Sequence, residues 1–162
     1  MQDILTCAMG LDVHRDIIVA CLVKGAVDAE PEAETRTFST LIPEMQKLRD
    51  WVIEAECRNV AMESTGIYWQ PIYEMLESCF NSEISILVVN ARHMKNVPGR
   101  KTDMKDAQWI ATLLRAGLLK GSFIPDKAFR ELRHLTRYRK SVVHDITAQK
   151  NRIDKFLQSS GF

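Results

Sequence analysis

The chain has 162 residues, of which 46% are hydrophobic and 27% charged, so it suits one globular domain with or without an appendage. No apolar run approaches the ~20 residues that a membrane span requires, which argues against a membrane protein. The net charge of +1 hides an asymmetry, because residues 1–90 carry 6 Lys and Arg against 15 Asp and Glu, whereas residues 91–162 carry 16 against 6.

The hydrophobic pattern of the first 90 residues predicts three strands, a helix, a strand, a second helix and a fifth strand. Residues 14–15 are a link short enough for a hairpin between the first two strands. One helix is expected to begin near Pro43 and the other at Gly66, with Pro71 in or near the first turn of the second. The expected strands are 4–13, 16–23, 33–38, 59–63 and 83–90.

This order predicts a mixed α/β sheet. The first three strands can pair antiparallel, whereas the later connections contain the helices that parallel pairing requires. The same order occurs in ribonuclease-H-like folds, in which the ends of the first and fourth strands lie side by side. We therefore expect a five-stranded mixed sheet flanked by helices, with Asp12 and Glu63 close together.

The cysteines and the N-terminus indicate the compartment. The four cysteines, at positions 7, 21, 57 and 79, match no zinc-ligand spacing, and their apolar neighbours predict buried, reduced thiols. The first charged residue, Asp3, is acidic, unlike the basic start of a secretory signal. The cytoplasm is the expected compartment.

The second half of the chain is predicted to be largely helical. Residues 103–117 form one expected helix, which Gly117 would end. Residues 127–157 contain no proline or glycine and repeat apolar residues at spacings of four and three, which predicts a coiled-coil helix. An ordinary helix interrupted by a turn is the alternative. Residues 1–122 are thus the expected first domain, and residues 123–162 a helical coiled-coil segment.

Four carboxylates have the placement that a divalent-cation phosphodiester enzyme needs. Asp12 and Glu63 end apolar runs, and Asp103 and Asp106 lie three residues apart on one helical face. Two-metal phosphoryl transfer requires several carboxylates that converge on cations about 4 Å apart, and Mg²⁺ prefers such oxygen ligands. Any one of these acids alone is more often a turn or cap residue. The prediction therefore rests on the set.

The basic half favours a polyanionic partner, because each neutralised phosphate releases condensed counterions. The alternative is a solvated basic face that only keeps the protein soluble. Nucleic-acid backbones are read by charge and shape, so no sequence specificity follows. The predicted phosphate contacts are Arg92, Lys95, Arg100, Lys101, Lys105, Arg130, Arg133, Arg137, Arg139 and Lys140.

Three motifs carry a resemblance to a known family. Residues 10–14 (GLDVH), 62–66 (MESTG) and 99–107 (GRKTDMKDA) resemble, in the same order, the N-terminal domain of DEDD-type insertion-sequence transposases, which are relatives of the Piv site-specific DNA invertases. The resemblance implies a RuvC-like domain whose Asp12, Glu63, Asp103 and Asp106 bind Mg²⁺ or Mn²⁺. It also implies an enzyme that cuts and rejoins DNA, in some members guided by a structured RNA.

The same resemblance implies a second, C-terminal domain that supplies a serine nucleophile through a coiled-coil segment. The sequence leaves no room for that domain after its last predicted helix, and neither Ser64 nor Ser160 matches its motif. We therefore expect an incomplete recombinase that oligomerises through its C-terminal helix. The alternatives are a stand-alone Holliday-junction or ribonuclease-H-type nuclease, and a non-catalytic module for nucleic-acid binding and oligomerisation.

Overall fold

The computed structural model describes residues 4–63, 66–80, 83–90 and 106–161. The chain divides into two compact units, Met1–Ser122 and Phe123–Phe162. The first, called the sheet unit below, contains every described strand, and the second consists mainly of one long helix. Among the described residues, no helix combines the length and the apolar character needed to cross a bilayer.

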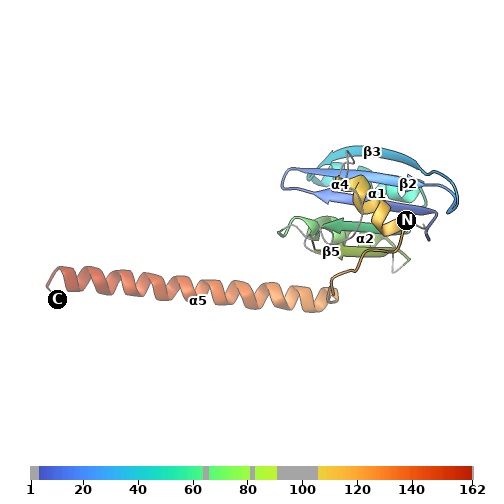
Figure 1. The fold of residues 1–162 in the computed structure, drawn as a ribbon. Coiled ribbons are helices and arrows are strands. Elements are labelled where there is room, and N and C mark those ends of the chain that lie inside the picture. The colour runs from blue at the N-terminus through green and yellow to red at the C-terminus, as the bar shows by residue number, and fades with distance from the viewer. Residues whose placement is uncertain (1–3, 64–65, 81–82, 91–105, 162) are drawn as a thin grey trace. The chain divides into compact units, whose positions relative to one another are not determined.

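The sheet unit is built on a five-stranded mixed sheet with the strand order β3-β2-β1-β4-β5. Antiparallel pairing joins β1 to β2 and β2 to β3, whereas β1 pairs parallel with β4, and β4 with β5 (Figure 1). The predicted ribonuclease-H-like α/β topology is therefore confirmed. The strands are β1 (Cys7–Val13), β2 (Ile17–Lys24), β3 (Glu32–Ser39), β4 (Asn59–Glu63) and β5 (Ser85–Val89).

Helices cover both faces of the sheet. On one face lie α1 (Ile42–Glu54) and α2 (Trp69–Phe80). Helix α1 buries one apolar stripe, and its Trp51 packs against Phe38 of β3 with the ring centroids 6.1 Å apart. Helix α4 (Asp106–Arg115), yellow in Figure 1, covers the other face.

Helix α4 ends where the sequence predicts. Gly117 adopts a φ of +67°, which favours glycine because a side chain is strained in this region. Leu118 N donates to Leu113 O at 3.0 Å, and Gly117 N donates to Leu114 O at 3.0 Å. These two bonds form a Schellman motif, which satisfies carbonyls that the end of a helix leaves unpaired.

The last residue of α4 corrects the predicted start of the first strand. The Arg115 carbonyl accepts hydrogen bonds from Ile4 N at 2.9 Å and from Leu5 N at 3.1 Å. The Arg115 side chain, only 1% exposed, donates from Nε to Leu5 O at 2.9 Å and from Nη2 to Ala26 O at 2.5 Å. Residues 4–5 therefore bond to the helix end, and β1 begins at Cys7 rather than at residue 4.

The cysteines are all free, but the prediction of uniformly buried thiols is wrong in part. Cys21 and Cys57 are buried, Cys7 is partly exposed, and Cys79 is exposed near the end of α2. An amphipathic helix presents one side to water, so an apolar neighbourhood in sequence did not determine which side Cys79 occupies.

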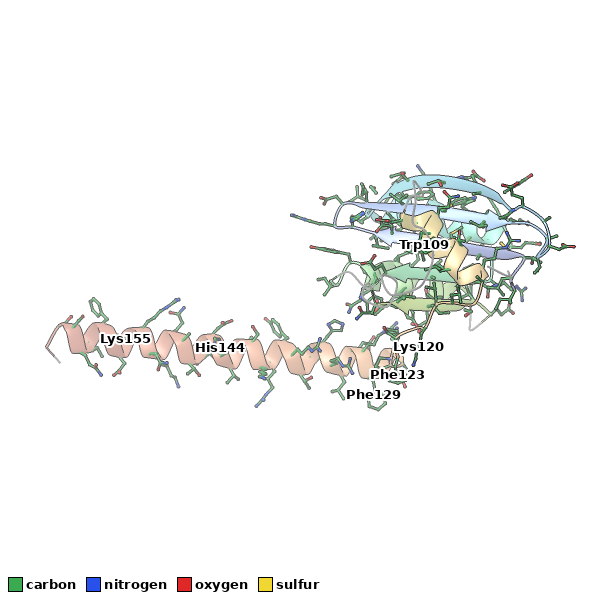
Figure 2. The ribbon with its side chains drawn as sticks, in the orientation of Figure 1. Trp109, Lys120, Phe123, Phe129, His144 and Lys155 are labelled. Atoms are coloured by element: carbon green, nitrogen blue, oxygen red, sulfur yellow. The ribbon has the colours of Figure 1, made fainter. Side chains whose placement is uncertain are left out.

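The second unit contains α5 (Lys127–Ser159), an unbroken helix of 33 residues, so the alternative of an interrupting turn is wrong. Asp126 caps it by accepting a hydrogen bond from Phe129 N at 3.0 Å. Phe129, His144 and Lys155 project from it along its length (Figure 2). Pairing with another helix stays a prediction. The heptad positions are Ala128, Leu132, Leu135, Arg139, Val142, Ile146, Gln149, Ile153 and Phe156.

Candidate active site

The site is positioned by a close contact between β1 and α4. A Cβ atom placed on Gly10 would lie 2.5 Å from Ala111 N and closer still to Ala107 O. The helix backbone therefore rests directly on the strand backbone, which only a residue without a side chain permits.

The contacts along β1 show in which direction α4 runs. Ala8 packs with Ile110 and Leu114, whereas Gly10, two residues further along the strand, meets Ala107 and Ala111. The helix therefore runs opposite to β1, since its earlier residues contact the later residues of the strand. Alternate strand residues share a face, so the next position on this face is Asp12, toward the end where α4 begins.

Glu63 reaches the same face from β4. The parallel register pairs Gly10 with Ala61 and Leu11 with Met62, so its continuation places Glu63 beside Asp12. Ala61 packs in the same cluster as Ala8, which shows that this face of β4 also meets α4. Neighbouring strands lie about 4.8 Å apart. Two carboxylates thus lie side by side at the carboxyl ends of adjacent parallel strands, on the face that α4 covers.

His14 belongs to this candidate site, although its place in the sequence predicted no role for it. Its Nε2 lies 3.0 Å from Asp12 Oδ2, so a proton on Nε2 is donated to the carboxylate. The Asp12 side chain is only 15% exposed, whereas that of His14 is 53% exposed. The signal in the sequence was the spacing of two residues, which places side chains on one face of an extended chain.

The side chains of the candidate site are of the type that binds a divalent cation, but the described residues supply too few of them for a complete metal site. Carboxylate oxygens are the ligands that Mg²⁺ and Mn²⁺ prefer, and Asp12 and Glu63 lie on adjacent strand ends. Asp106 is the exposed first residue of α4. Within the described parts of the chain, no three His, Cys, Asp or Glu residues form a group that could hold a metal ion. Asp103 lies outside the described residues.

The predicted phosphate contacts divide into three groups. Arg92, Lys95, Arg100, Lys101 and Lys105 lie outside the described residues. On α5, Arg133, Arg137, Arg139 and Lys140 are exposed. Arg130 corrects the prediction, because it is only 6% exposed and its Nη1 donates to Pro125 O at 2.7 Å. That guanidinium is engaged at the start of the helix, so we remove it from the set.

Comparison with known proteins gives one family. The family model of the DEDD transposases of the IS110 type, described as Transposase, matches residues 9–161. No curated protein matches the chain.

Several solved structures are similar to the chain. Thermus thermophilus RuvC is 12% identical, with a TM-score of 0.49 over 72% of this chain and 99% of that chain. The same RuvC in complex with a Holliday junction substrate is 12% identical, with a TM-score of 0.49 over 73% and 100%. A Fowlpox virus resolvase with Holliday junction DNA is 12% identical, with a TM-score of 0.43 over 60% and 65%.

Proposed function

The chain belongs to the DEDD transposase family, and on this premise we propose that its sheet unit is the metal-binding catalytic domain of a DNA transposase or site-specific recombinase. The observation that carries the proposal is the placement of Asp12 and Glu63 on adjacent parallel strand ends, on the face that α4 covers. The prediction from the sequence assigned the metal to these two acids together with Asp103 and Asp106. The proposal keeps all four as ligands of Mg²⁺ or Mn²⁺.

The chain's own residues would prepare this site before any substrate arrives. Pairing with Val19 of β2 holds the backbone of Asp12, and the bond to His14 fixes the direction of its carboxylate. Gly10 keeps α4 close, so Asp106 at the helix start stays near the same end of the sheet. A bound divalent cation would supply charge stabilisation for the attacking and leaving oxygens of phosphoryl transfer.

The basic face of α5 supports nucleic acid as the partner. The helix carries nine Lys and Arg against three Asp and Glu, and exposed cations attract a phosphate backbone whatever its sequence. We propose DNA as the substrate and a structured guide RNA as a second partner, since charge and shape suit both. The cytoplasm, where prokaryotic DNA lies, is the proposed compartment.

The exposed apolar positions of α5 support association with another helix. Leu135 is 67% exposed and Phe156 is 70% exposed, although both occupy heptad positions. Apolar side chains at such positions are buried when two helices pair. We propose that copies of the chain associate through α5, and that strand exchange also requires a serine-bearing C-terminal domain.

A DNA-binding and cleavage assay separates this function from its two rivals. The purified chain is mixed with Mg²⁺ or Mn²⁺ and labelled branched and linear DNA, and binding and cleavage are measured in parallel. The proposal expects DNA binding without completed strand exchange. Cleavage of branched DNA that is lost in Asp12→Ala would instead indicate a stand-alone nuclease. Recombination by this chain alone would contradict the proposed need for a second domain.

Metal binding distinguishes the proposed function from the third candidate, a non-catalytic module. A module would bind DNA equally well with and without a divalent cation and would bind no Mn²⁺. The proposal expects Mn²⁺ to bind and Asp12→Ala to abolish that binding, while DNA binding through α5 persists.

A further inference from the structure

Two free thiols meet at the end of β1 and β4 opposite to the acids. Cys7 is the first residue of β1, and Cys57 lies in the connection between α1 and β4. The parallel register pairs Met9 with Val60, so its continuation places Cys7 opposite residue 58, next to Cys57. A strand spacing of about 4.8 Å with a stagger of one residue gives a Cα separation of about 6 Å, which lies within the range that disulfides span.

Hydrogen bonds hold the two cysteines in this arrangement. Asn59 Nδ2 donates to Cys7 O at 3.3 Å, and Cys57 Sγ donates to Asn59 O at 3.3 Å. The Cys57 thiol also lies within hydrogen-bonding reach of the Cys7 sulfur. One asparagine thus bonds to both cysteines and keeps them close together.

The surroundings give the two thiols different reactivity. The hydrogen bond with Cys57 lowers the pKa of Cys7 to about 7, against the opposing effect of burial and with help from the charges of Lys24 on β2 and Arg115 on α4. The same hydrogen bond, together with burial, raises the pKa of Cys57. Cys57 is 1% exposed, whereas Cys7 is partly exposed. Cys7 is therefore the accessible nucleophile, and Cys57 a shielded thiol beside it.

We propose that Cys7 and Cys57 are a modification site that closes into a reversible disulfide when the protein meets a small-molecule disulfide such as glutathione disulfide. The Cys7 thiolate attacks one sulfur of the oxidant, whose S–S bond breaks and releases the first glutathione thiolate. Cys57 then gives up its proton and attacks the Cys7 sulfur of the mixed disulfide, which releases the second glutathione. Two electrons pass from the cysteine pair to the oxidant, which is reduced to two thiols.

The disulfide would join β1 to the connection that leads into β4. These are the two strands that carry Asp12 and Glu63 at their other ends. A cross-link between positions 7 and 57 restricts the unfolded chain, so the oxidised sheet unit should unfold at a higher temperature than the reduced one. Oxidation therefore fixes the pairing of the two acid-bearing strands.

Mass spectrometry after oxidation tests the proposal. The chain with Cys79→Ser, which removes the exposed thiol, is incubated with glutathione disulfide, digested without reduction and mapped. We expect the loss of two hydrogen masses, a linked pair of peptides that contain Cys7 and Cys57, and full reversal by dithiothreitol. Buried Cys21 serves as the internal control and stays a free thiol.

Two single variants test the order of the steps. Cys57→Ala should stop at a glutathione adduct on Cys7, whereas Cys7→Ala should stay unmodified. The pH midpoint for alkylation of Cys7 should lie near 7 in the protein with Cys57 and higher in Cys57→Ala. A stable glutathione adduct on Cys7 in a chain that retains Cys57, or no reaction at all, would overturn the proposal. The expected rise in unfolding temperature on oxidation is measured by comparing the oxidised and the reduced chain, without a variant.

Discussion

Most apolar side chains of β1 and β4 in the sheet unit are buried, whereas the apolar side chains at the heptad positions of α5 are exposed to water. Leu11 and Val60 are 0% exposed, while Leu135 and Phe156 on α5 are 67% and 70% exposed. A sheet with helices on both faces buries its own core. A single helix with an apolar stripe gains most of its stability from a partner. The candidate catalytic residues thus lie on a unit that buries its own core, whereas the apolar stripe of α5 would be buried only by the pairing proposed above.

The largest expected effect is on the stability of the sheet unit. In Gly10→Ala the new Cβ would strike the backbone of α4, 2.5 Å from Ala111 N, and helix and strand would have to separate. We expect a loss of at least about 3 kcal/mol in the free energy of unfolding of the sheet unit. All three tryptophans of the chain, Trp51, Trp69 and Trp109, lie in this unit. Their fluorescence during urea denaturation therefore reports on it and not on α5.

Gly121→Ala is the matched control for this variant. The three atoms nearest to a Cβ there all belong to the Leu87 side chain, the closest at 3.3 Å, and a side chain can move aside. We expect a change below about 1 kcal/mol. Equal denaturation midpoints for Gly10→Ala and the unmodified chain would contradict the close packing of α4 on β1.

The next largest expected effect is on self-association through α5. Ile146→Asp puts a charge at a heptad position that is 50% exposed in the single chain, whereas Thr147→Asp puts the same charge at the next position, off the seam. Because a charge is costly in a coiled-coil seam, we expect Ile146→Asp to weaken self-association at least about tenfold, or 1.4 kcal/mol. Analytical ultracentrifugation measures the association constant.

The tryptophan unfolding midpoint should stay the same in both of these variants, because the sheet unit does not depend on α5 for its core. A monomeric unmodified chain, or equal weakening by the two aspartates, would mean that the seam is not the interface.

The smallest expected effect is on nucleic-acid affinity. Arg137 is exposed on α5 and lies outside the heptad seam. In Arg137→Gln one phosphate contact is lost, so the slope of log K against log salt should fall by about one, equally for different DNA sequences. Arg58→Gln removes a cation of the sheet unit whose side chain is 69% exposed, and it should leave the slope unchanged. Fluorescence anisotropy at several salt concentrations compares the two, and equal slopes would remove Arg137 from the interface.

Much of the sheet could be predicted because its information is local. Continuous apolar runs identified the strands, helices between the later strands required parallel pairing, and topology brought Asp12 and Glu63 to adjacent strand ends. Gly117 and the unbroken α5 followed from the chemistry of helix termini and from the absence of proline and glycine. These features depend on neighbours in the sequence.

The features that could not be predicted depend on contacts between distant residues. Ile4 has the apolar character of a strand residue, yet its N–H donates to Arg115 O at 2.9 Å. Arg130 has the charge of a phosphate contact, yet it is 6% exposed and bonded to Pro125. Cys7 and Cys57 are brought together by the register between β1 and β4, which the predicted strand order did not specify. No local pattern in the sequence records such pairings.

The most direct test of the central claim is a Mn²⁺ titration in which free Mn²⁺ is measured by electron paramagnetic resonance. The chain, Asp12→Asn, Glu63→Gln and the control Asp16→Asn are compared; the Asp16 side chain is 83% exposed and lies 3.8 Å from Arg15 Nε. The account predicts saturable binding that weakens at least about tenfold in Asp12→Asn and Glu63→Gln and is unchanged in Asp16→Asn. Equal binding by all four proteins, or none by the unmodified chain, would contradict it.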